Sequence, residues 1–359
     1  MNTLRSILFK ILPSVVAIIL TLAVGGLVVF LMGRNPGEVA VRFAEGTFGS
    51  AYGIGQILFK ATPLICTGLA AAVSFRSGLF NIGAEGQLAV GGFVTAWIGF
   101  SFPGLPGVVL LPMAILGGMV GGAAWGAIPG LLKARFGAHE VINTIMMNFI
   151  AAALVSYLVN NLFAVQGTMH TPEIGVGADI PRLGIYLPFF QGSPVNVSLL
   201  LALTACVVVW YLFWKTRLGY ELRTLGHNPH AARYAGIPIG SRTITAMAIA
   251  GACAALGGTN FIMGYKHYYE LGFSENTGFI GIAVALLGNN HPAGIVLAAL
   301  LFGTLDYGGL TVNTMVPKEI VNILQGLIII LVIVLTKVLD KWMISAKISV
   351  KKPAGEANA

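Results

Sequence analysis

The feature that most constrains this chain is a series of apolar runs that recur along nearly its whole length. Runs of about 18 residues or more are long enough to cross the hydrocarbon core of a bilayer as helices. A further apolar stretch, 276–306, is interrupted by the sequence Asn289-Asn290-His291-Pro292. The pattern predicts an all-α, polytopic membrane protein. The uninterrupted runs lie at about 13–32, 56–75, 78–100, 108–132, 141–163, 195–214, 243–264 and 319–340.

The composition excludes other classes of protein. Apolar residues make up 56% of the chain and charged residues only 9%, whereas a soluble domain carries roughly a quarter of charged residues. So few charges cannot coat a water-facing surface, and so apolar a chain does not stay disordered. The three cysteines, Cys66, Cys206 and Cys253, lie inside apolar runs without metal or redox spacing. They are interpreted as packing residues, and no metal site is expected.

The basic residues predict how the chain lies in the membrane. With the N-terminus inside, 15 of the 21 Lys and Arg residues fall on the cytoplasmic side, as the positive-inside rule requires. The tail with its five lysines stays inside only if 276–306 crosses twice or forms a re-entrant hairpin. We therefore expect about ten membrane segments, including a broken or re-entrant helix pair, with both termini cytoplasmic. The excess of positive charge then lies at the cytoplasmic surface of the lipid bilayer. It is explained by the topology, and no nucleic-acid partner is expected.

The predicted topology also defines the domains and the longest loops of the chain. Residues 1–344 are expected to form a single transmembrane domain, followed by a polar cytoplasmic tail, 345–359. The longest external loop is 165–194, which is rich in Gly and Pro, and the longest cytoplasmic loop is 215–242.

The cytoplasmic loop contains the signals of a short helix. Asn228 suits the N-cap and Pro229 the first helical position. Gly236 suits the position just after the last turn, so a helix is predicted over 229–235. Seven residues are marginal as an isolated helix, so either the membrane body or a docked partner must hold it. An ordinary basic loop explains the segment equally well on local grounds.

A second polar segment interrupts the run at 78–100. Asn81, Glu85 and Gln87 lie there among glycines. An intramembrane carboxylate is costly and usually faces a cavity or a partner. Asn81 and Glu85 are four residues apart and share a helical face. The segment either lines a pathway or is a satisfied packing site.

Further polar residues lie in the run at 141–163 and at the start of the broken region. Asn143, Thr144 and Asn148 are close to one helical face, and Asn276 precedes the broken stretch. Amides in lipid bond neighbouring helices or line a polar pathway, and local physics alone favours packing. The candidate pathway residues are Asn81, Glu85, Gln87, Asn143, Thr144, Asn148 and Asn276.

Two of these segments resemble known motifs. The run 219–237 resembles the coupling loop of permease subunits of bacterial ABC importers, in the branch that serves branched-chain amino acids, ribose-type sugars and nucleosides. The run 81–87, Asn-Ile-Gly-Ala-Glu-Gly-Gln, is similar to a signature of the nucleoside and simple-sugar permeases. The resemblance implies that the loop couples the permease to an ATPase through Gly219, Glu221, Arg223, Gly226, Asn228, Ala232, Tyr234 and Gly236.

The resemblance also implies partners. It implies a transporter of the bacterial plasma (inner) membrane with two permease subunits, identical or homologous, and an extracytoplasmic solute-binding protein. ATP and Mg would be bound by a separate cytoplasmic ATP-binding subunit, and this chain would hold no cofactor. The sequence contains no Gly-x4-Gly-Lys-Ser/Thr phosphate loop, so the chain is not expected to be an enzyme.

The solute implied is a nucleoside or a related simple sugar. An alternative is an ion-coupled secondary transporter of a small polar solute, with Glu85 or Asp306 as the coupling carboxylate.

Overall fold

The computed structural model describes residue 16 and residues 19–317, 319–328, 330–331, 334–335 and 338. The expected tail, 345–359, lies outside the described residues. Within these ranges every regular element is a helix, and strand-like pairing is limited to two isolated bridges, His170–Glu270 and Arg182–Asn196. The expected all-α class is confirmed. The chain divides into two compact units, Glu45–Tyr307 and Met1–Ala44 with Gly308–Ala359.

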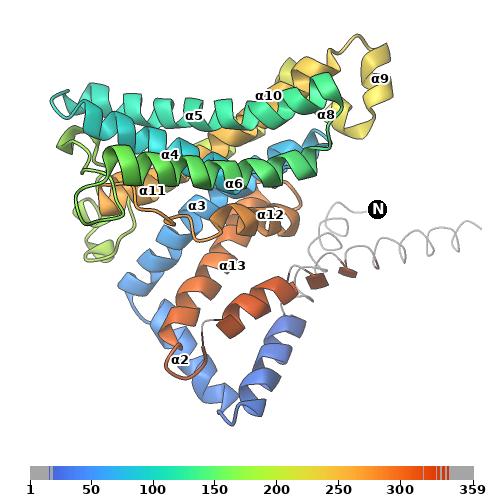
Figure 1. The fold of residues 1–359 in the computed structure, drawn as a ribbon. Coiled ribbons are helices and arrows are strands. Elements are labelled where there is room, and N and C mark those ends of the chain that lie inside the picture. Colours follow the sequence, from blue (N-terminus) through green and yellow to red (C-terminus); the bar gives the residue numbers. More distant parts are fainter. Residues whose placement is uncertain are drawn as a thin grey trace, which may run out of the picture. The chain divides into compact units, whose positions relative to one another are not determined.

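The larger unit contains most of the helices (Figure 1). The last of these helices, α13, continues into the smaller unit. The helices are α3 (Ala51–Arg76), α4 (Ala84–Ser101), α5 (Gly107–Phe136), α6 (Glu140–Leu158), α7 (Ser198–Lys215), α8 (Arg217–His227), α9 (Pro229–Tyr234), α10 (Ile239–Leu256), α11 (Gly258–Phe261), α12 (Thr277–Leu287) and α13 (Pro292–Thr311). π-Helical turns follow α6 and α11, at Val159–Phe163 and Ile262–Lys266, and three 3₁₀ turns lie at Val176–Ala178, Leu183–Ile185 and Pro188–Phe190.

Among the described residues, six helices are long and apolar enough to cross a membrane, or seven if the bent pair Ile19–Leu31 and Pro36–Phe48 counts as one span. Five of them coincide with predicted runs, and the sixth is the second half of the broken region. Helix α4 is not among the six, since Glu85 and Gln87 in its first turns lower its hydropathy. The six are Ala51–Arg76, Gly107–Phe136, Glu140–Phe163, Ser198–Lys215, Ile239–Lys266 and Pro292–Thr311.

The smaller unit differs from the single N-terminal span expected at 13–32. Its described residues form a helix over Ile19–Leu31 and most of a second helix, α2 (Pro36–Phe48), which ends in the larger unit, and the two helices are bent by 120°. Gly33 lies between them in the left-handed region, with φ of 74°, and Pro36 begins the second helix. A shorter helix covers Glu319–Ile328. One buried hydrophobic cluster among the described residues of this unit consists of Val29, Val39, Val312 and Val316, against which Phe43, Met315 and Ile320 pack.

The predicted interruption of the region 276–306 is confirmed. Helix α12 ends at Leu287 and α13 begins at Pro292. Asn289 and Asn290 between them have left-handed φ values of 53° and 52°, which Asn tolerates better than most residues. Helix α12 has 11 residues and is about 16 Å long at 1.5 Å per residue. It is too short to cross a bilayer alone, so the total of about ten crossings stays a prediction.

Glycines allow close packing in the larger unit. Helix α5 lies along α4 and α10. A Cβ added to Gly251 of α10 would lie 2.0 Å from the carbonyl oxygen of Gly122 of α5, and one added to Gly118 would lie 1.9 Å from Oγ1 of Thr95 of α4. The three backbones therefore approach more closely than any larger residue would permit, which is how small residues hold membrane helices together.

This packing predicts the effect of Gly251→Ala. The added methyl group meets a backbone carbonyl that cannot rotate away, so we expect a loss of about 1–3 kcal/mol of stability. The measurement is the apparent unfolding temperature of the detergent-solubilised protein. Gly104→Ala is the control, because a Cβ there meets nothing within 4 Å. Equal unfolding temperatures for the two variants would contradict the close packing of α5 and α10.

Candidate functional site

Helices α8 and α9 form a layer at one end of α5 and α10 (Figure 1). Thr216 caps α8, its Oγ1 accepting a hydrogen bond from the N–H of Gly219 at 3.1 Å. A Cβ added to Gly219 would lie 2.0 Å from the carbonyl oxygen of Leu212 in α7. One added to Gly226 would lie 2.2 Å from the carbonyl oxygen of Arg76 in α3. Glycine at these two positions therefore lets α8 lie directly against the ends of α7 and α3.

Helix α9 has the caps that its sequence predicts. The side-chain oxygen of Asn228 accepts hydrogen bonds from two backbone N–H groups of the first turn, at 2.9 and 3.1 Å. Gly236 has a φ of 74°. The N–H groups of Gly236 and Ile237 bond to carbonyls of the last turn at 3.0 Å each, which is the Schellman closure. The predicted helix over 229–235 is confirmed, ending one residue earlier at Tyr234.

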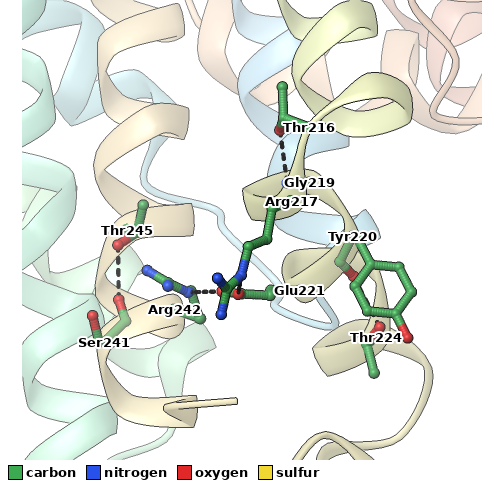
Figure 2. A network of polar contacts seen from close by, with 9 residues as sticks. All are labelled: Thr216, Arg217, Gly219, Tyr220, Glu221, Thr224, Ser241, Arg242 and Thr245. Carbon is green, nitrogen blue, oxygen red and sulfur yellow. Dashed lines mark hydrogen bonds and ion pairs between the residues drawn. The ribbon is translucent and has the colours of Figure 1, made fainter. Parts of the chain in front are cut away.

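A buried carboxylate ties α8 to α10 (Figure 2). Glu221 is only 5% exposed. One of its oxygens accepts from Nε of Arg217 at 2.9 Å, and the other accepts from Nε of Arg242 in the first turn of α10. The hydrogen bond from Arg242, aided by that from Arg217, holds the pKa of Glu221 below its ordinary value of 4.5. This pairing therefore stabilises the fold above pH 4.5, and the contribution is lost as the pH falls through the lowered pKa.

The residues predicted to couple to an ATPase have different surroundings. Gly219, Glu221, Gly226 and Ala232 lie inside the layer, and Ala232 is fully buried. Asn228 and Gly236 shape the two ends of α9. Tyr234 is 95% exposed. Nε of Arg223 is buried and has no hydrogen-bond partner among the described residues. Most of the residues predicted to couple to an ATPase therefore stabilise the packing of α8 and α9. Tyr234 is the one large side chain of this set that is almost fully exposed.

Amide side chains fill the gap before α4. Residues 78–83 are not helical. Fully buried Asn81 and Gln87 exchange two hydrogen bonds, at 3.1 and 3.3 Å. The Asn81 oxygen also accepts from the N–H of Gly83 at 2.9 Å. These amides therefore satisfy one another and the backbone that leads into α4.

Side chains of α6 hold the same irregular segment. The N–H of Ile82 donates to Oγ1 of Thr144 at 3.2 Å, and the carbonyl of Ile82 accepts from Nδ2 of Asn148 at 2.9 Å. The Asn148 oxygen accepts from the N–H of Gly86 at 2.9 Å. Nδ2 of Asn143 is buried without a partner in the described part of the chain. The structure thus brings Asn81, Gln87, Thr144 and Asn148 together around residues 82–86.

Glu85 joins the start of α4 to the start of α12. Its carboxylate accepts hydrogen bonds from the N–H of Gly278 at 2.7 Å and from Oγ of Ser274. A Cβ on Gly278 would lie 2.3 Å from the backbone nitrogen of Glu85, so the two helix starts touch. Asn276 directly precedes α12, is exposed and has a φ of 66°.

Arg76, the last residue of α3, makes a contact that the sequence does not predict. Its Nε donates to the carbonyl of Asn290 at 2.5 Å, in the break between α12 and α13. Its guanidinium lies 4.5 Å from the ring centre of Trp214, which stands edge-on to His291 at 5.2 Å. The sequence showed Arg76 only as one more basic residue at a helix end. Its partners lie 138 and 214 positions away along the chain, which no local pattern indicates.

The family described as branched-chain amino acid transport system, permease component, matches residues 53–333. The chain belongs to this family. It is a multi-pass permease subunit of an ABC transporter of the inner membrane, as the resemblance implied.

Three relatives align with almost the whole chain. The guanosine ABC transporter permease NupP of Bacillus subtilis is 40% identical over 90% of this chain and 93% of its own length. The nucleoside ABC transporter permease NupB of Lactococcus lactis is 37% identical over 90% and 91%. The glucose ABC transporter permease TsgB13 of Haloferax volcanii is 36% identical over 89% and 86%.

The pairing at Glu221 predicts the effect of Glu221→Gln. The amide cannot balance the charge of Arg242, whose side chain is only 27% exposed, whereas water compensates the largely exposed Arg217. We expect the amides of α8 to exchange hydrogen several-fold faster, measured by mass spectrometry. Glu173→Gln, which changes an exposed acid of the loop 165–194, is the control. Unchanged exchange in α8 would contradict a fastening role for Glu221.

Proposed function

We propose that this chain is the permease of an ATP-driven importer of nucleosides, with simple sugars as the second candidate class. The relatives named for guanosine, nucleosides and glucose support this solute class. Neutral amides, which suit uncharged solutes with many hydroxyl and amide groups, dominate the polar cluster around residues 82–86. Asn81, Glu85, Gln87, Asn143, Thr144, Asn148 and Asn276 are the proposed pathway residues.

The observation that carries the proposal is the layer of α8 and α9. Seven or fewer residues do not make a stable helix in water unaided, yet α9 is capped at both ends and projects an almost fully exposed tyrosine. Aromatic side chains presented this way are common anchors of protein interfaces. We infer that α9 docks on a cytoplasmic ATP-binding subunit that binds ATP and Mg and carries out the hydrolysis.

The proposed topology has about ten membrane segments and both termini in the cytoplasm. The irregular residues 267–276 support two crossings by the broken region. At their start they bond to the loop 165–194, through the N–H of Ile174 to the carbonyl of His267 at 2.8 Å. At the far end of α12, Asn290 bonds to Arg76 beside α8. Residues 267–290 thus run from the proposed external loop to the proposed cytoplasmic layer, and α13 returns.

The proposed mechanism begins at the ATPase. When two ATP-binding subunits close on ATP, they displace α9, and α8 moves with it. Helix α8 passes the displacement on because its glycines contact α3 and α7 directly and Glu221 bonds to α10. The membrane helices then change access from the external to the cytoplasmic side. A solute-binding protein would deliver the solute at the loop 165–194, and a second permease, identical or homologous, would complete the transporter.

The exposed anchor predicts the effect of Tyr234→Ala. A central aromatic anchor typically contributes 2 kcal/mol or more to an interface, so we expect roughly 30-fold weaker binding of the ATP-binding subunit. The measurement is the affinity of the purified permease for that subunit in detergent. Tyr186→Ala is the control, because Tyr186 is also exposed but lies in the loop 165–194. Equal affinities of the two variants would place the docking surface elsewhere.

Reconstitution tests the function directly. Proteoliposomes with this chain, its second permease, the ATP-binding subunit and the solute-binding protein are expected to accumulate guanosine when ATP is supplied at the cytoplasmic face. Uptake of glucose instead would select the sugar class. Uptake by this chain alone under an ion gradient without ATP would support the ion-coupled alternative. The bonds already made by Glu85 and the ion pair of Asp306 with Lys60, at 3.0 Å, argue against that alternative.

A further inference from the structure

Arg76 contacts three elements from one position. Its side chain bonds to the backbone of Asn290 between α12 and α13, and its guanidinium lies on the ring of Trp214 at the end of α7. Its carbonyl oxygen is so close to α8 that a Cβ on Gly226 would lie 2.2 Å away. Arg76 is therefore in contact with α7, α8 and the break at once.

The backbone after Arg76 packs tightly against the backbone of α8. A Cβ added to Gly78, which has a φ of 72°, would lie 2.9 Å from Cα of Gly226. Backbone meets backbone here without an intervening side chain, and close-packed contacts transmit displacement rather than absorb it. A shift of α8 must therefore change the position of Arg76.

Helix α12 ends just before Asn290, the residue to which the side chain of Arg76 bonds. Its interfaces are made of small residues: a Cβ on Gly281 would lie 2.4 Å from Oγ1 of Thr67 in α3. Glu85 fastens its first turn and Arg76 fastens the break after its last turn. The side-chain oxygen of Asn290 is buried and has no partner within the described ranges. This residue is held by its backbone, through its N–H to the carbonyl of Ala285 at 2.8 Å and through its own carbonyl to Arg76.

We propose that Arg76 is a positioning residue that transmits the movement of α8 to the break between α12 and α13. This inference rests on the proposed function, because it assigns to Arg76 a step between ATP use and solute movement. The guanidinium is required because its planar group bonds to a carbonyl and stacks on an indole at the same time, which the compact ammonium of lysine does not do. Loss of Arg76 therefore separates hydrolysis from transport.

The experiment measures solute transported per ATP hydrolysed in the reconstituted transporter. In Arg76→Met we expect the ATP-binding subunit to co-purify in the normal ratio and to retain most of its hydrolysis. The number of solute molecules moved per ATP is expected to fall about tenfold, within the usual range of coupling effects. Arg76→Lys is expected to lie in between. Arg135→Met is the matched control, because Arg135 is an exposed arginine in the last turn of α5.

The fluorescence of Trp214 provides a second readout that a purely structural role would not affect. In a transporter in which Trp214 is the only tryptophan of this chain, ATP is expected to change its emission, and Arg76→Met is expected to abolish that change. An unchanged ratio of transport to hydrolysis in Arg76→Met overturns the inference.

If Arg76→Met does not fold, Arg76→Lys and Trp214→Leu decide instead. A wild-type ratio in both variants overturns the inference, and a lowered ratio in either supports it. A wild-type transporter that hydrolyses ATP without any uptake would instead defeat the proposed function, and the role of Arg76 with it.

Discussion

The structure depends on one constraint: backbone groups that leave a helix within an apolar chain must find other hydrogen-bond partners, because lipid offers none. Two of the interruptions of helical structure in the larger unit lie at residues 78–83 and 288–291. Each interruption is met by polar side chains from other helices. Thr144 and Asn148 bond to the backbone of Ile82, and Arg76 bonds to the carbonyl of Asn290. Polar side chains from other helices therefore supply the hydrogen bonds that the irregular backbone needs at these two places.

This constraint brings the two interpretations of the polar residues together. Packing and pathway were alternatives at Glu85, Asn81 and Asn148, yet interrupted helices at membrane depth are also where transporters place their solute sites. Glu85 fastens the start of α12 by accepting from the N–H of Gly278 and from Ser274. A group that stabilises an interruption in one state is well placed to exchange its partner for a solute hydroxyl in another.

The sequence was a good guide wherever the signal is local. Apolar runs identified five of the six spanning helices, and Asn228, Pro229 and Gly236 identified α9 to within one residue. Contacts between distant segments were not predictable. Glu85 and Gly278 are 193 positions apart, and the late start of α4 at Ala84 follows from bonds that α6 makes to residues 82–86. The bend before α2 was also missed, at Gly33, whose φ is 74°, and Pro36, with which the second helix begins.

The contacts around α8 differ in how they would respond to movement. At Gly219 and Gly226 backbone lies against backbone, so displacement passes on at once and cannot be relieved by a rotamer change. At Arg76 and Glu85 the links are side-chain hydrogen bonds, which can break and form again with other partners. Backbone contacts that cannot yield, next to hydrogen bonds that can change partners, allow two alternative arrangements of the helices. Binding of a partner at α9 can then favour one arrangement over the other. Helix α12, short and held near both ends by exchangeable hydrogen bonds, is therefore the part of the larger unit best suited to change its partners when α8 and the end of α3 move.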